Sequence, residues 1–244
     1  TLGVLFAMGV VWLLLALSGC SEDSDSIFFD PSSRLEEIVF QDGISPDPSY
    51  SGTRDAFLKE GNPFNNYNFG TTPQDTVGHL YLTDSYYERR FIIRFDISEI
   101  TDCGEVLSAE LQLHFSSPSP DTLTLQAYQV TVPEILVTSW LEGINGIFGG
   151  VSWSTADEDI PWDMEGGDLV DPPVETVVTS QDTLISFTLP NSLVLGWIED
   201  PETNHGVVIR LADAVLEESI ILHARESLVL DERPLLKIEY LGGG

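Results

Sequence analysis

The chain has 244 residues, of which 40 are Asp or Glu and 10 are Lys or Arg, so its formal net charge at pH 7 is −30. That length suits one folded domain with tails, and the charge opposes binding to nucleic acid, which relies on Lys and Arg that neutralise phosphates. The hydrophobic share of 42% and the aromatic share of 10% exclude a wholly disordered chain, which combines high charge with few apolar residues.

The first nineteen residues are uncharged and overwhelmingly apolar, and the chain turns polar and acidic from Ser21. This pattern is typical of an export signal. The junction Leu17-Ser18-Gly19-Cys20 resembles the bacterial lipobox, which implies cleavage before Cys20 and a lipid on its thiol. The alternative is a membrane-spanning helix, since roughly 20 apolar residues cross a bilayer. We expect a lipoprotein of the bacterial envelope, and Ser21 after the cysteine favours the outer membrane and the cell surface.

A tether is expected to follow the signal peptide of residues 1–19. Residues 20–52 are rich in Ser, Asp and Pro, which is typical of an extended spacer. Within it, only residues 35–40 suggest an added strand or helical turn. The folded domain is predicted over residues 53–241, followed by a glycine tail at 242–244.

From residue 53 onward the apolar residues recur with a period of two, which is typical of half-buried strands. Turn-forming Gly, Pro and Asp separate these segments, and the one short helix is predicted over residues 192–199. The sequence therefore predicts an all-β fold, a β-sandwich or jelly roll of about ten short antiparallel strands. The predicted strands are residues 54–58, 77–82, 88–96, 106–115, 122–130, 183–189, 206–212, 219–225 and 235–240.

Several short motifs occur in the order found in one known family. They include Asp55-Ala56-Phe57, Arg94-Phe95-Asp96-Ile97, Gly166-Gly167-Asp168 and Asn204-His205-Gly206. The chain thus resembles the DNRLRE-domain family over about residues 53–240. The resemblance implies a jelly roll similar to carbohydrate-binding modules. Some members of the family are associated with acidic glycans. This sequence departs from the family in a longer Asn-Tyr-Asn-Phe-Gly motif and in lacking a catalytic domain beside the module.

Polar side chains on the solvent faces of the predicted strands form the candidate ligand site. Arginine suits an acidic sugar because its planar fork donates two hydrogen bonds to one carboxylate. The alternative is that these arginines form ordinary cross-strand ion pairs with nearby acids. The candidate residues are Arg90, Arg94, Gln112, His114, Tyr128, Arg210, His223 and Arg225.

No Lys or Arg occurs from Asp96 to Val208, so the middle of the chain is strongly acidic. Calcium takes six to eight oxygen ligands, and a structural calcium ion is a candidate here. The alternative is a solvated acidic loop without the regular spacing of an EF-hand. The candidate calcium ligands are Asp157, Asp159, Asp163 and Asp168.

The tryptophans admit two roles, because an indole ring stacks on sugar as well as it fills a core. We expect Trp140 and Trp197 in the core, while Trp153 and Trp162 stay open between the two roles. Cys103 is the only cysteine besides Cys20, so no disulfide is expected between two unmodified cysteines.

No nucleophile elbow, zinc-protease motif or phosphate-binding loop occurs, so we expect no enzyme, and a polysaccharide-degrading enzyme is the weakest alternative. The function that the sequence favours is non-catalytic binding of an extracellular polysaccharide, acidic or neutral, by a lipid-anchored module. The main alternative is a structural or adhesion lipoprotein that binds a protein partner. Contact with the membrane is expected through the lipid alone.

Overall fold

A computed structural model describes residues 34–117, 122–136, 138–147, 149–179, 181–212 and 218–243. Antiparallel strands dominate these residues, as the alternating pattern predicts. The predicted signal peptide and Cys20 lie outside the described residues. The strands are β1 (Arg34–Gln41), β2 (Thr53–Lys59), β3 (Tyr67–Asn68), β4 (Gln74–Leu82), β5 (Ser85–Phe95), β6 (Cys103–Ser117), β7 (Leu123–Thr131), β8 (Gly146–Ile147), β9 (Thr155–Asp157), β10 (Ile160–Pro161), β11 (Asp168–Val178), β12 (Leu184–Thr188), β13 (Val207–Leu211), β14 (Ser219–His223) and β15 (Leu235–Gly242).

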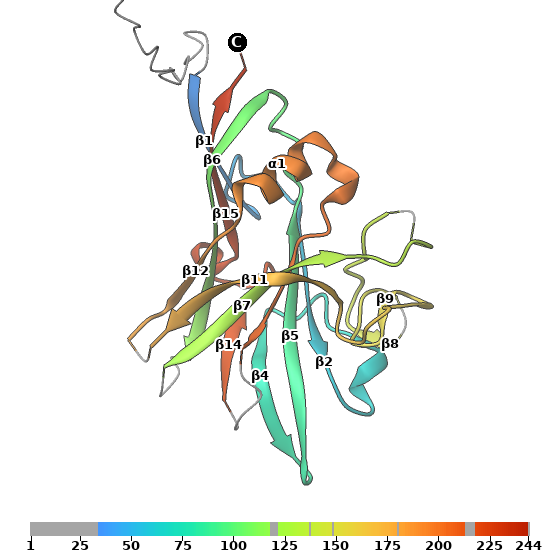
Figure 1. Cartoon of the computed structure of the whole chain (residues 1–244). Coiled ribbons are helices and arrows are strands. Elements are labelled where there is room, and N and C mark those ends of the chain that lie inside the picture. Colours follow the sequence, from blue (N-terminus) through green and yellow to red (C-terminus); the bar gives the residue numbers. More distant parts are fainter. Residues whose placement is uncertain are drawn as a thin grey trace, which may run out of the picture. The chain divides into compact units, whose positions relative to one another are not determined.

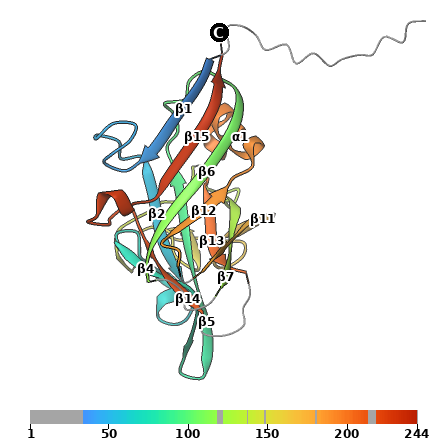
Figure 2. The ribbon, with the colours of Figure 1, turned by 90° about the vertical axis from the view of Figure 1, so that its left-hand side faces the viewer.

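Two layers of strands pack face to face as a β-sandwich of the jelly-roll type (Figures 1 and 2). One layer has the order β1-β15-β6-β12, and the other contains β14, β4, β5, β2, β13, β7 and β11. The end of the long strand β6 also pairs with β14 and so links the layers. Helix α1 (Asn191–Glu199) contacts β6 (Figure 1) and contributes Val194 and Trp197 to the main core. Three short 3-10 turns lie at Phe64–Asn66, Pro201–Thr203 and Leu230–Glu232.

The main core lies between the two layers and follows the predicted alternation. Phe91, Ile93 and Phe95 on β5 face Leu111 and Leu113 on β6, and all five are buried. The helix predicted at residues 192–199 is also confirmed. The long strand β11 was not predicted; its pairing with β7 shifts register between Val170 and Val174, where two prolines interrupt the alternation.

The sandwich begins well before the predicted end of the tether. Strand β1 pairs along its whole length with β15, and Phe40 and Tyr50 are buried in the main core. The prediction of a tether up to residue 52 is therefore wrong for residues 34–52, because their apolar side chains complete the first layer. The open prediction for residues 35–40 resolves as a strand.

The outer face of the second layer carries a second hydrophobic cluster. The segment between β7 and β11 folds over this face and buries the side chain of Ile92 on β5. The alternation of β5 predicts a solvent face for Arg90, Ile92 and Arg94, and this prediction is wrong. All four tryptophans discussed above are buried, as expected for Trp140 and Trp197. The second cluster consists of Ala56, Leu58, Ile92, Val130, Trp140, Val151, Trp153, Ala156, Trp162 and Val208.

The β4–β5 hairpin extends beyond both clusters. It turns at Thr83 and Asp84, both with positive φ, as expected for the tight turns that match strand twist. Tyr81 and Tyr86 stand directly opposite each other on it, 42% and 53% exposed. Among the described residues, none belongs to a helix long and apolar enough to span a membrane.

Candidate functional site

A cleft of about 810 Å³ lies at one end of the sandwich. Three connections meet there: the β1–β2 loop, the β5–β6 loop, and the turn that follows α1. Its lining residues are Tyr50, Ser51, Gly52, Arg54, Arg94, Phe95, Asp96, Ile97, Ser98, Glu99, Ile100, Thr101, Trp197, Ile198, Pro201 and Asn204. We call this surface the arginine cleft.

Two arginines share one wall of the arginine cleft. Arg54 on β2 and Arg94 on β5 are direct cross-strand partners, a position in which like charges repel each other. Arg54 donates to the carbonyls of Ser51 and Thr53 and has its Nε 3.9 Å from an oxygen of Glu142. Arg94 stacks on Trp140, with its guanidinium carbon 5.4 Å from the ring centroid.

Arg94 has no ion pair with any carboxylate of the described residues. Burial lowers its pKa from the ordinary arginine value, and the charge of Arg54 lowers it further. Its Nε is buried without a hydrogen-bond partner. The cleft thus holds a partly desolvated cation beside a second cation, while the carboxylates of Asp96 and Glu99 stand on exposed residues of the lining.

Two further lining residues carry unused hydrogen-bonding atoms. Trp197 is 4% exposed, and its indole Nε1 has no hydrogen-bond partner in the described part of the chain. Asn204 donates to the carbonyl of Phe95, while its Oδ1 is buried and unpartnered there. A smaller cleft of about 420 Å³ between α1 and the β7–β11 pair is also lined by Trp197. Both residues line the arginine cleft, but these two atoms are closed off from solvent, so the cleft presents its two arginines and the hydroxyls of Ser51, Ser98 and Thr101.

The predicted arginines Arg90 and Arg210 form ion pairs away from this cleft. Both contact Glu88, at 2.7 Å from Arg90 Nη2 and 2.8 Å from Arg210 Nε. Arg90 also donates to the carbonyl of Gly166 and stacks on Trp153, 4.7 Å from the ring centroid. These two arginines follow the alternative of structural ion pairs.

Arg225 is surrounded by acids from separate segments. Its Nε and Nη2 lie 2.6 and 2.8 Å from the two oxygens of Glu142, and its Nε lies 2.9 Å from Glu226. Asp42 lies 3.5 Å from Nη1, and Asp55 accepts the backbone N–H of Arg225. We call Asp42, Asp55, Glu142 and Glu226 the carboxylate cluster.

The carboxylate cluster also completes the edge of β2. The backbone N–H of Asp55 donates to Glu142, and that of Thr53 donates to Asp42. Oxygens of Asp55, Glu142 and Glu226 lie within 4.8 Å of one another. The guanidinium of Arg225 lies beside them and supplies one positive charge.

The remaining predicted ligand residues do not converge. Gln112 and His114 lie on β6 in the first layer, whereas Tyr128 lies on β7 and donates to Gln126. His223 is buried, with its Nδ1 2.8 Å from Glu232. The prediction that these residues form one ligand-binding surface is wrong, because their strands belong to different layers and most of the arginines have acidic partners.

The candidate calcium ligands do not gather either. Asp168 uses its two carboxylate oxygens to accept the backbone N–H groups of Asp163 and Met164. Asp157 lies on β9 and Asp159 on the following turn. No three of these four carboxylates, all of them described, bring their oxygens within 4.8 Å of one another, so the geometry favours the alternative of an acidic loop.

Arg54 and Asn204 line the arginine cleft but are not among the predicted site residues. The signal for Arg54 is its register opposite Arg94, which becomes visible only when the pairing of β2 with β5 is known. Asn204 lies in a motif that was used for the family resemblance alone. Of the predicted set, Arg94 is the one residue that lines the arginine cleft.

The chain was also compared with known proteins. No protein-family model matches it, and no curated protein matches it. Among solved structures, a chain from the full particle of Israeli acute paralysis virus heated to 63 degrees is similar to it at 9% sequence identity. The TM-score is 0.26, and the match covers 98% of this chain and 80% of the viral chain. The resemblance to the DNRLRE family stays a prediction from the motifs.

Proposed function

We propose that this protein is a surface-anchored lipoprotein whose β-sandwich binds an extracellular polysaccharide without cleaving it, at the arginine cleft. The observation that carries the proposal is the pairing of Arg54 with Arg94 in a chain whose net charge is −30. Two like charges held opposite each other cost stability. A carboxylate-bearing ligand in the cleft would offset that cost.

The composition of the cleft supports a sugar rather than a simple anion. A uronic acid presents a carboxylate for the guanidinium fork and hydroxyl groups that both donate and accept. Beside the arginines, the cleft is lined by the exposed Ser51, Ser98 and Thr101, whose hydroxyls both donate and accept. A cleft of about 810 Å³ falls in the size range of ligand pockets, roughly 300–1,000 Å³.

The motifs shared with the DNRLRE family and the lipobox around Cys20 support the same proposal from the sequence. The lipid would hold the module at the envelope, and the segment before β1 would act as its spacer. The outer membrane remains the proposed location.

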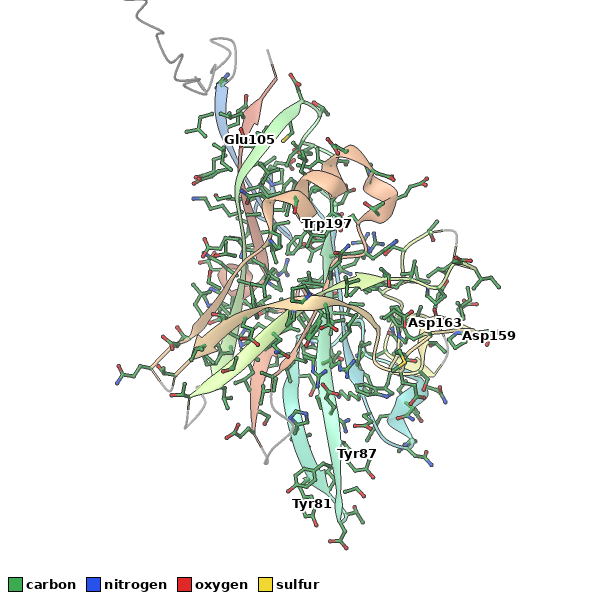
Figure 3. All side chains as sticks on the ribbon, in the orientation of Figure 1. Tyr81, Tyr87, Glu105, Asp159, Asp163 and Trp197 are labelled. Carbon is green, nitrogen blue, oxygen red and sulfur yellow. The ribbon has the colours of Figure 1, made fainter. Side chains whose placement is uncertain are left out.

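A protein partner is the second candidate, and the β4–β5 hairpin favours it. Tyr81, Leu82 and Tyr86 are exposed at its tip, and the two tyrosine rings lie 4.8 Å apart. In Figure 3, Tyr81 lies near the lower tip of the hairpin and Trp197 lies well above it, beside helix α1, so the hairpin is separate from the arginine cleft. Tyrosine is enriched where proteins bind one another.

Calorimetric titration of the chain with a polyuronate, with a neutral dextran as the control polymer, tests the polysaccharide proposal. Arg94→Met is expected to lower polyuronate affinity by about tenfold or more, since charge-assisted hydrogen bonds are worth roughly 1.5–3 kcal/mol. The matched control is Arg34→Met, which removes an equal charge from an arginine whose side chain is 83% exposed on β1. It should bind as the unaltered chain does.

Either of two results would count against the proposal. Absence of saturable binding to polyuronate and dextran alike would leave the protein-partner function in its place. Equal loss of affinity in Arg94→Met and Arg34→Met would mean that the polymer senses overall charge and not the cleft.

A further inference from the structure

The carboxylate cluster gathers four acids around Arg225, and Arg54 is the second arginine within 4 Å of one of its carboxylate oxygens. Its four acids come from the β1–β2 loop, β2, the segment over the second layer and the turn after β14, and the guanidinium of Arg225 is central to them. Asp55 is 1% exposed, and Asp42 and Glu142 are 7% exposed. Three buried carboxylates beside the half-buried Glu226 disfavour full ionisation, because desolvation and mutual repulsion both favour protonation.

The second cation of the cluster is Arg54, which also lines the arginine cleft. Its Nε lies 3.9 Å from an oxygen of Glu142, and its Nη1 donates to the carbonyls of Ser51 and Thr53. Arg54 therefore stands between the cluster and the cleft. The charge of the cluster decides how strongly Arg54 is drawn away from a ligand.

We propose that the carboxylate cluster holds a proton, and that loss of this proton weakens anion binding at the arginine cleft. This regulation rests on the proposed function, because it acts on the same cleft. When the cluster is protonated, Arg225 balances more of its charge and Arg54 is available to the ligand. When the proton leaves, the cluster attracts Arg54 and repels a carboxylate in the cleft.

The titration of the cluster agrees with this geometry. Burial raises the pKa of Glu226 to about 7, and the nearby Glu142 and Asp42 raise it while Arg225 lowers it. Burial also raises the pKa of Asp55 well above its ordinary value. The charged groups that face the cluster are Arg54 and Asp55 from β2, Arg94 from β5, Asp42 and Arg233 from the segments beside β1 and β15, Glu142 from the covering segment, and Arg225 with Glu226 after β14.

The sign of the pH effect follows from the raised pKa of Glu226. A carboxyl whose folded pKa exceeds its unfolded value stabilises the fold fully below the unfolded pKa and loses that contribution as pH rises through the folded pKa. The loss should fall between the ordinary glutamate value of 4.5 and about 7. Since Glu226 is partly exposed, solvent screens part of the effect.

The test measures thermal unfolding of the full chain between about pH 5 and pH 8. The melting temperature of the unaltered chain should fall by on the order of 3 °C across this range, and Glu226→Gln should remove most of the fall. Glu105→Gln is the control, since Glu105 is exposed on β6 (Figure 3) and lies outside the cluster. Direct titration of the Glu226 carboxyl carbon by NMR should give a midpoint near 7.

The binding arm repeats the polyuronate titration at about pH 6 and about pH 8. One added charge near the cleft should weaken binding on the order of fivefold at the higher pH, and Glu226→Gln should reduce that difference. Identical pH profiles of stability in the unaltered chain and Glu226→Gln overturn the proton site.

The two proposals fail in distinguishable ways. If the carboxyl titrates near 7 while polyuronate affinity stays constant with pH, the coupling to the cleft is wrong and the proposed function stands. If no polyuronate binds at any pH, the proposed function is wrong, and so is the proposed regulation of binding. The NMR titration still decides whether the cluster holds a proton.

Discussion

Two arginines on the outer face of β5 have the same kind of aromatic neighbour and opposite electrostatic surroundings. Arg90 stacks on Trp153 and Arg94 stacks on Trp140. Arg90 has Glu88 at 2.7 Å and the carbonyl of Gly166 at 2.8 Å. Arg94 has no carboxylate partner among the described residues and faces Arg54 across the strands.

The presence or absence of a carboxylate partner separates a structural arginine from a candidate binding arginine on the same strand. Gly166 packs against Arg90, where a Cβ would lie 2.6 Å from its Nη1, and the Arg90 side chain is only 10% exposed. Arg94 instead lines a cleft of about 810 Å³. An arginine that is stacked but electrostatically unsatisfied at a cleft is the better candidate for an anionic ligand.

Among the variants proposed here, Trp140→Ala should lower the free energy of unfolding most. Trp140 is the largest fully buried side chain of the described residues, and its Nε1 donates to the carbonyl of His205. Truncation should lower the free energy of unfolding by about 3–5 kcal/mol and leave Arg94 without its stacking surface. Denaturant unfolding measures the loss; a cost below about 1 kcal/mol would mean that the covering segment does not pack as described.

Removal of Arg90 should have an intermediate effect. Arg90→Met keeps apolar contact with Trp153 but leaves Glu88 with Arg210 as its remaining ion-pair partner. Breaking a buried ion pair costs about 3–5 kcal/mol when one charge is left alone, so with Arg210 still present we expect about 2 kcal/mol. Denaturant unfolding checks this value, and an unchanged stability would mean that Arg210 alone balances Glu88.

Alternation in the sequence predicts the main core because one face of each strand packs against the other layer. Phe91, Ile93 and Phe95 are buried as that pattern requires. The same pattern fails for Ile92, which a separate segment of the chain covers. An isoleucine between Arg90 and Arg94 was the local sign that this face is not simply solvated.

The candidate site was less predictable because it depends on contacts between distant residues. Glu142 bonds to the N–H of Asp55, 87 positions away, and Arg54 meets Arg94 through strand register. Periodicity assigns a residue to a face of its own strand but does not say which layer that strand joins. Gln112 and His114 were therefore grouped with arginines of the other layer.

The smallest stability effect should come from Arg94→Met. Replacing an unpaired, partly buried cation with an apolar chain of similar length removes its desolvation cost and its repulsion from Arg54, while contact with Trp140 remains. We expect the free energy of unfolding to change by less than about 0.5 kcal/mol, against about 2 kcal/mol for Arg90→Met. Parallel denaturant titrations of the two variants make the comparison. If Arg94→Met proved as costly as Arg90→Met, Arg94 would have a structural partner, and its loss of polyuronate binding would no longer identify the cleft.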